Sequence, residues 1–115
     1  MFPEITIKHI GINAATSVEA DRVAQIFSEM MGVETVCGIK SNFSGDLIEV
    51  MKGNGRGTYG HIALAVDSIE EAIPCFQSRG ISFDAESAGY DENGIMKIIY
   101  LEGEYAGFAV HLARK

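Results

Sequence analysis

The sequence predicts an α+β fold in which two βαβββ modules form one curved, eight-stranded mixed sheet with the helices outside. Two observations support this prediction. A short apolar strand, a helix with an apolar stripe and a glycine follow one another at 5–32 and again at 60–80. Three more segments with strand character follow each helix. We expect a single domain over residues 1–115, with module one at about 4–53 and module two at about 59–115.

Module one is predicted to contain a strand at 5–13, a helix at 17–31 and strands at 34–37, 40–43 and 47–52. The helix has clear end signals. Thr16-Ser17-Val18-Glu19 has the pattern of a capping box, and Gly32 suits the left-handed position that follows a helix. Apolar residues recur at helical spacing, which indicates a face packed against the sheet.

Module two is predicted to contain a strand at 60–66, a helix at 68–79 and strands at 82–87, 97–101 and 107–113. Asp67-Ser68-Ile69-Glu70 is a looser capping pattern, and Gly80 follows the helix. Pro74 lies beyond the first turn, where proline removes a hydrogen bond and bends the axis. The glycine-rich segment 53–60 connects the modules.

Charge and hydropathy exclude two classes of partner. The net charge is −7 and there is no basic stripe, so we expect no nucleic-acid partner. No apolar run reaches the roughly 20 residues that span a bilayer, so we expect no membrane partner. The first residues lack signal-peptide features, and Cys37 and Cys75 are isolated in the sequence. A cytoplasmic location with reduced cysteines is therefore expected, although the sequence leaves a disulfide open.

All three histidines lie in short apolar strands, on the face opposite the bulky aliphatic residues: His9, His61 and His111. Glu49 has a comparable place in the strand at 47–52. A helix is expected to cover each bulky face, so the opposite face, with small residues beside the histidines, would line a concavity. One such histidine is more often structural. Three at matching positions of a repeat, with a glutamate, instead predict a divalent metal site of His9, Glu49, His61 and His111.

The segment Tyr59-Gly60-His61-Ile62-Ala63-Leu64-Ala65-Val66 resembles the opening of the second module in glyoxalase-type members of the vicinal oxygen chelate superfamily. That superfamily includes glyoxalase I, bleomycin-resistance proteins, extradiol dioxygenases and methylmalonyl-CoA epimerase. Its members place metal ligands on the first and last strands of each module, which implies the same four residues here. Members commonly form dimers, so the resemblance also implies a homodimer, with the four ligands drawn from one chain or from two.

A closer resemblance is to the glyoxalase-like domain appended to some bacterial 2-keto-3-deoxy-6-phosphogluconate/4-hydroxy-2-oxoglutarate aldolases. It is carried by four short segments: Lys8-His9-Ile10-Gly11-Ile12-Asn13, Ile48-Glu49-Val50-Met51-Lys52, Gly60-His61-Ile62-Ala63 and Gly107-Phe108-Ala109-Val110-His111-Leu112. The resemblance implies a setting in sugar-acid or 2-oxo-acid metabolism.

The favoured function is that of a metal-dependent enzyme acting on a small 2-oxo or hydroxy acid by enediolate-forming isomerisation, epimerisation or lyase chemistry. The ion would be zinc, nickel, cobalt, manganese or iron. Glyoxalase I has a catalytic carboxylate where this chain has His111, so methylglyoxal detoxification is not expected. Glu49 is then the candidate base.

Two alternatives stay open. The domain could be a non-catalytic binder or sensor of a small molecule, as bleomycin-resistance proteins show for this kind of fold. It could also be a non-haem iron dioxygenase, although the third imidazole would fill a position that oxygen needs. Arg56 could contact an anionic substrate, but a solvated loop arginine is the simpler interpretation. Asn13 and Tyr100 are candidates either for lining the cavity or for packing.

Overall fold

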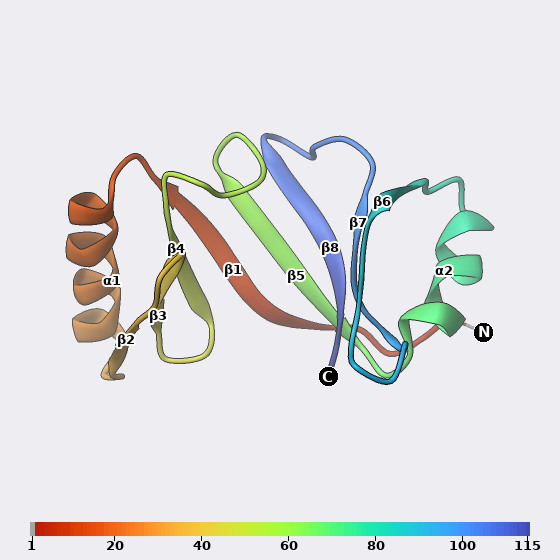
Figure 1. Cartoon of the computed structure of the whole chain (residues 1–115), viewed down its shortest axis with the longest axis horizontal. Helices are drawn as coiled ribbons and strands as arrows, with labels where there is room; N and C mark the ends of the chain where they lie inside the picture. The colour runs from red at the N-terminus through yellow and green to blue at the C-terminus, as the bar shows by residue number, and fades with distance from the viewer. Residues whose placement is uncertain (1) are drawn as a thin grey trace.

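The computed structural model describes residues 2–115, which form eight strands and two helices around one sheet (Figure 1). The elements in chain order are β1 (Thr6–Ala14), α1 (Ser17–Met31), β2 (Thr35–Cys37), β3 (Ser41–Ser44), β4 (Ile48–Lys52), β5 (Gly60–Val66), α2 (Ile69–Gln77), β6 (Phe83–Tyr90), β7 (Met96–Leu101) and β8 (Phe108–Arg114). Within this described part of the chain, neither helix is long and apolar enough to span a membrane.

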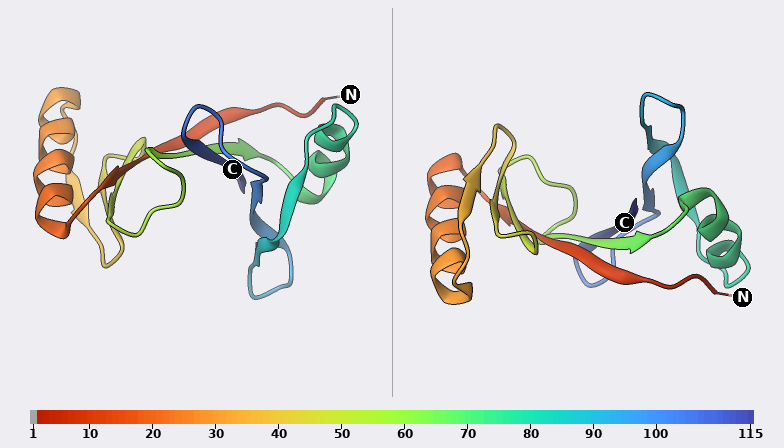
Figure 2. Two further views of the ribbon diagram at one scale, coloured as in Figure 1. Left: turned by 90° about the horizontal axis from the view of Figure 1, so that it is seen from above. Right: turned by 90° about the horizontal axis from the view of Figure 1, so that it is seen from below.

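The sheet is mixed and has the strand order β2-β3-β4-β1-β5-β8-β7-β6. β1 runs parallel to β4, and β5 runs parallel to β8, so the two halves repeat one arrangement. The halves meet at the antiparallel pair β1 and β5. The predicted fold is therefore confirmed, including the βαβββ order of each half. Both ends of the sheet turn toward the same side, with a helix outside each end (Figure 2).

Most predicted element bounds agree with the structure to within two residues. The exception is the end of β6, predicted at 87 and observed at Tyr90. The strand continues because Gly89 and Tyr90 pair with Ile98 and Met96 of β7. Pairing with a partner strand, rather than local propensity, sets this boundary.

The helix ends follow from local hydrogen bonds. Thr16 caps α1 by accepting a hydrogen bond from the Glu19 amide at 3.1 Å, and Gly32 ends it with φ of 68°. The Glu19 carboxylate reaches back to the amide of Ala15, one residue before the position expected in a capping box. At α2, Ser68 accepts from the Glu71 amide at 3.3 Å, so this cap lies one residue later than predicted.

Each helix packs against the bulky face of its own half of the sheet. The cluster under α1 contains Ala20 and Ala24 with Ile48 and Val50 of β4. The cluster under α2 is larger and is built from Val66, Ile69, Ala72, Phe76, Met96, Ile99, Leu101 and Leu112. Strand residues that alternate with these point to the other face of the sheet. The cores therefore fix which face of the sheet carries the histidines.

Candidate metal centre

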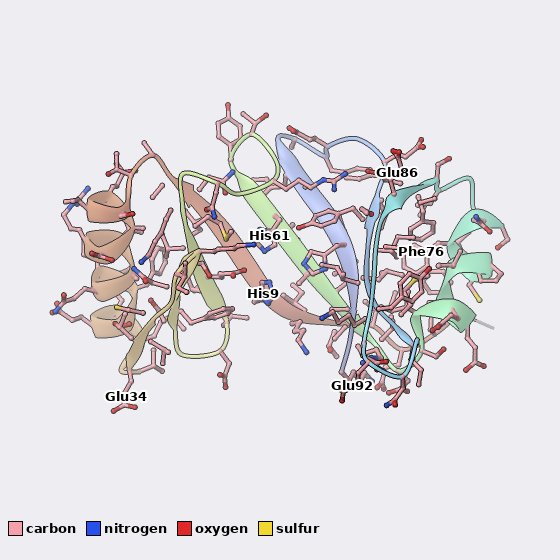
Figure 3. The ribbon with its side chains drawn as sticks, in the orientation of Figure 1. His9, Glu34, His61, Phe76, Glu86 and Glu92 are labelled. Atoms are coloured by element: carbon pink, nitrogen blue, oxygen red, sulfur yellow. The ribbon has the colours of Figure 1, made fainter. Side chains whose placement is uncertain are left out.

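Four central strands carry the predicted site residues: His9 on β1, Glu49 on β4, His61 on β5 and His111 on β8. The register brings them to one level of the sheet. Gly11 is opposite both His61 and Glu49, while Ala63 is opposite both His9 and His111. Figure 3 shows His9 and His61 at the middle of the sheet. The strand pairing therefore gathers side chains that are up to about a hundred residues apart in sequence.

The donor atoms of these side chains converge. The Nε2 atoms of His9 and His61 lie 3.1 Å apart. Glu49 Oε1 lies 3.1 Å from Nε2 of His61 and 3.3 Å from Nε2 of His9. His111 completes a set in which one ring nitrogen from each histidine lies within 4.8 Å of the others.

These spacings fit a small divalent cation. Ligand nitrogens at 2.0–2.1 Å from a tetrahedral zinc ion are about 3.3 Å from one another. The Nε2 atoms of His9 and His61 face each other and the same Glu49 oxygen, and no placement of protons on the two rings turns all three contacts into hydrogen bonds. A cation bound between them would be coordinated by all three atoms at once, so the residues present fit the predicted group.

The protonation states also suit metal binding. Burial is the main cause that lowers the pKa of His111, to about 4, so this imidazole is neutral near pH 7. Its Nδ1–H donates to the Leu112 carbonyl at 3.2 Å, which leaves the Nε2 lone pair for a ligand. Metals bind the neutral form of histidine.

Glu49 is held as an anion. Burial alone would raise the pKa of Glu49, but hydrogen bonds from His61, His9 and Ser41 outweigh it and place the pKa well below its usual value. Ser41 donates from its hydroxyl to Oε2 at 2.6 Å, while Oε1 faces the two histidines. Both carboxylate oxygens are therefore engaged, which suits a ligand better than a free base.

Gly11 makes room for the buried ring of His61. A Cβ atom at Gly11 would collide with the His61 imidazole, because the two residues face each other across β1 and β5. His61 is only 4% exposed, and within the described chain its Nδ1 has no hydrogen-bond partner. The glycine was visible in the sequence, but its role depends on a strand register that local patterns do not reveal.

A second group of residues adjoins the histidines on the β7 side. The Tyr100 ring centroid lies 4.8 Å from that of His111, its opposite residue across β7 and β8. Arg56 places its guanidinium 4.1 Å from the Tyr100 ring centroid and pairs with Asp84 at 2.7 Å. Arg56 is an exposed loop arginine, as the simpler sequence interpretation expected, and these two contacts orient its guanidinium. Burial raises the pKa of Tyr100, Arg56 opposes this, and the charge of Glu49 adds to it.

Asn13 ties the glycine-rich connection to the sheet. Its Nδ2 donates to the Gly57 carbonyl at 2.8 Å. Asn13 therefore holds the segment from which Arg56 projects. No sequence signal pointed to Asp84 or Ser41, whose contacts link strands and loops distant in the chain.

On the β1 side, His9 borders an open cavity of about 570 Å³. Phe43 meets His9 edge-on, with ring centroids 5.6 Å apart. The other lining residues are Lys8, Val36, Gly45 and Asp46. A small molecule therefore has space beside the histidine cluster, next to an apolar wall.

Comparison with solved structures identifies the kind of fold. A hypothetical protein, BH1468 from Bacillus halodurans C-125, is 17% identical and has a TM-score of 0.64, over 97% of this chain and 95% of that chain. A methylmalonyl-CoA epimerase is 16% identical with a TM-score of 0.61, over 94% and 93% of the two chains. The Mycobacterium tuberculosis methylmalonyl-CoA epimerase is 14% identical with a TM-score of 0.60, over 94% and 86%.

These likenesses concern the fold, because the sequence identities are low. The chain therefore shares the βαβββ fold of these solved structures, as the sequence predicted. No family model matches the sequence, and no curated protein matches it significantly.

Proposed function

We propose that this protein is a metal-dependent enzyme of the glyoxalase type. It would act on a small 2-oxo or hydroxy acid by enediolate-forming isomerisation, epimerisation or lyase chemistry. The observation that carries the proposal is the convergence of His9, His61 and Glu49, with 3.1–3.3 Å between their donor atoms, beside the neutral imidazole of His111.

The four residues would hold the ion, and Ser41 would keep Glu49 oriented through its hydroxyl. A divalent ion at this position supplies Lewis-acid stabilisation of negative charge on substrate oxygens. Glu49 is also proposed as the proton acceptor, with Oε2 as the oxygen that can exchange its Ser41 hydrogen bond for a substrate proton. The neighbours that are epimerases support the isomerase class, and the resemblance to the aldolase-appended domain supports a 2-oxo acid.

A non-catalytic binding or sensing role is the second candidate. It is favoured by one observation: hydrogen bonds to both Glu49 oxygens lower its pKa, which weakens it as a base. Such a protein would bind metal and ligand without exchanging a substrate proton.

The first test is the metal content of untagged protein purified without chelator, by elemental mass spectrometry. We expect near-stoichiometric metal, lost in His61→Ala and retained in Glu29→Gln, which changes an exposed glutamate of α1. Absence of metal and of uptake of added metal would refute the metal site.

The second test is the exchange of the C3 protons of 2-oxobutyrate for deuterium, followed by proton NMR in D₂O. An enolising enzyme accelerates this exchange over buffer, and Glu49→Gln abolishes it. Metal binding without any acceleration, across a panel of 2-oxo acids, would favour the binding role instead. The homodimer and the cytoplasmic location stay predictions, the first to be checked by light scattering.

A further inference from the structure

Arg56, Tyr100 and His111 form a continuous row of contacts that ends at the histidine cluster. The Arg56 guanidinium stacks on Tyr100 at 4.1 Å from the ring centroid, and the Tyr100 ring is 4.8 Å from His111. The backbone of Tyr100 is tied to β6, since its amide donates to the Ser87 hydroxyl at 2.8 Å. The Arg56 guanidinium is therefore separated from the proposed metal ligand His111 by one side chain, that of Tyr100.

Arg56 is held by more contacts than an exposed loop arginine usually makes. Arg56 lies in a glycine-rich segment whose ordering costs conformational entropy. That segment is anchored by the Asn13–Gly57 hydrogen bond, and Arg56 itself is oriented by Asp84. Exposed ion pairs of this kind contribute little to stability, and the Arg56 side chain is still 43% exposed. A contribution to stability alone therefore does not account for this arrangement.

The donors of this row remain available for a ligand. Only Nη2 of Arg56 is paired with Asp84, which leaves the other N–H groups of the guanidinium. Among residues 2–115, no hydrogen bond to the Tyr100 hydroxyl is formed. In a chain of net charge −7 with Glu49 at the cluster, such a cation favours the approach of an anionic substrate.

We propose that Arg56 binds the carboxylate of a small hydroxy or 2-oxo acid, and that the Tyr100 hydroxyl donates a hydrogen bond to the same ligand. Both are substrate-positioning residues, and the choice of substrate class rests on the proposed function. A planar guanidinium suits a carboxylate because it offers parallel N–H donors. The site would therefore select acids over their neutral analogues.

The test compares L-lactate with L-lactamide, which differ in the carboxylate but share the hydroxyl. Dissociation constants are measured by ¹H–¹⁵N NMR titration of the full chain, once with zinc added and once metal-free, following the backbone amides of β7 and β8 in every variant and the Arg56 Nε–H signal where Arg56 is present. The variants are Arg56→Gln, Tyr100→Phe and Lys8→Gln. Arg79→Gln is the matched control, because Arg79 also stacks on an aromatic ring, that of Phe2, at 4.1 Å.

We expect the wild-type protein and Arg79→Gln to bind lactate at least tenfold more tightly than lactamide. Arg56→Gln should lose this preference while its zinc content, measured in parallel, is unchanged. Tyr100→Phe should weaken both ligands severalfold and keep the preference. An unchanged zinc content shows that Arg56→Gln is folded, so a lost preference between two ligands of the same shape reports the missing guanidinium.

Three results would overturn the inference: no binding of lactate to wild type, a preference that survives in Arg56→Gln, or a preference that is lost instead in Lys8→Gln. The last would assign the carboxylate to Lys8, which lines the cavity beside His9. If the protein takes up no zinc, the proposed function fails separately. The metal-free titration then decides: a lactate-specific shift at Arg56 upholds the inference, and its absence overturns it.

Discussion

Gly11 and His61 face each other across the antiparallel pair β1 and β5, and the imidazole occupies the space that a side chain at Gly11 would need. The position of a proposed metal ligand in one half of the chain thus depends on a glycine in the other half. Replacing Gly11 by alanine should displace the His61 ring and lower zinc affinity at least tenfold. Isothermal titration with zinc measures this effect.

The control for Gly11→Ala is Gly80→Ala. Gly80 has φ of 82° and open space around its Cα, so alanine there introduces backbone strain far from the histidines. Each substitution should cost about 1–3 kcal/mol of unfolding free energy, from overpacking or from strain. Zinc affinity should fall in Gly11→Ala alone. An equal loss in both variants would show that His61 is not positioned by Gly11.

The stability of the metal-free protein should decrease as the pH falls from about 6.5 to 4. The pKa of His111 is about 4 in the folded protein, lowered mainly by burial, against an ordinary value of 6.5. The unfolded chain therefore takes up a proton first on acidification, and the stability present above pH 6.5 is lost as the pH falls toward 4. The difference corresponds to about 3 kcal/mol.

Urea unfolding at pH 7.0 and 4.5 checks this prediction, with His111→Gln as the comparison. The variant should lose the part of the slope that His111 contributes. Glu49, whose pKa is also lowered in the folded protein, acts in the same direction only below about pH 4.5, so it adds little between the two pH values compared. A wild-type slope unchanged in His111→Gln would contradict the assignment.

Ser41→Ala should lower zinc affinity about tenfold or more, the usual effect of removing a hydrogen bond that orients a metal ligand. The Ser41 hydroxyl donates to Glu49 Oε2 at 2.6 Å, so its loss frees the carboxylate to rotate. Ser78→Ala is the matched control, since the Ser78 hydroxyl donates to the Cys75 carbonyl at 2.7 Å at the end of α2. Zinc titration of both variants separates the two effects. A loss of affinity in Ser41→Ala alone comes from the freed Glu49 carboxylate, whereas an equal loss in both variants comes from the general effect of removing a serine hydroxyl.

Asn13→Ala should loosen the segment 53–59 without changing zinc affinity. The substitution removes the Nδ2 hydrogen bond to the Gly57 carbonyl. Amide hydrogen exchange within this segment should accelerate at least fivefold, while exchange in β5 stays slow. Equal exchange rates in the variant and the wild type would mean that other contacts hold the segment.

The alternation of strand residues was sufficient to predict both the fold and the face on which His9, His61, His111 and Glu49 lie. Apolar residues alternate with a period of two in any strand that has one covered face. The face on which a residue lies can therefore be predicted without knowing the partner strand. The approach of the three histidines to one another, and of Glu49 to His9 and His61, followed from the repeat, because matching strands of two similar modules occupy matching places.

The surroundings of the site required the structure. The contact of Tyr100 with His111 depends on the register of β7 against β8, and the Arg56–Asp84 pair joins a loop to a strand 28 residues away. The extension of β6 to Tyr90 has the same origin in strand pairing. None of these contacts has a local signature, since each is decided by packing between distant segments.

The two halves of the chain contribute unequally to an otherwise matched arrangement. The first strands both supply histidine, but the last strands supply Glu49 in one half and His111 in the other, and only the second half adds Tyr100. A flat, symmetric molecule held between them would meet an anion on one flank and a neutral ring with a phenol on the other. The departure from internal symmetry would therefore give the two flanks of any planar ligand bound there chemically distinct surroundings.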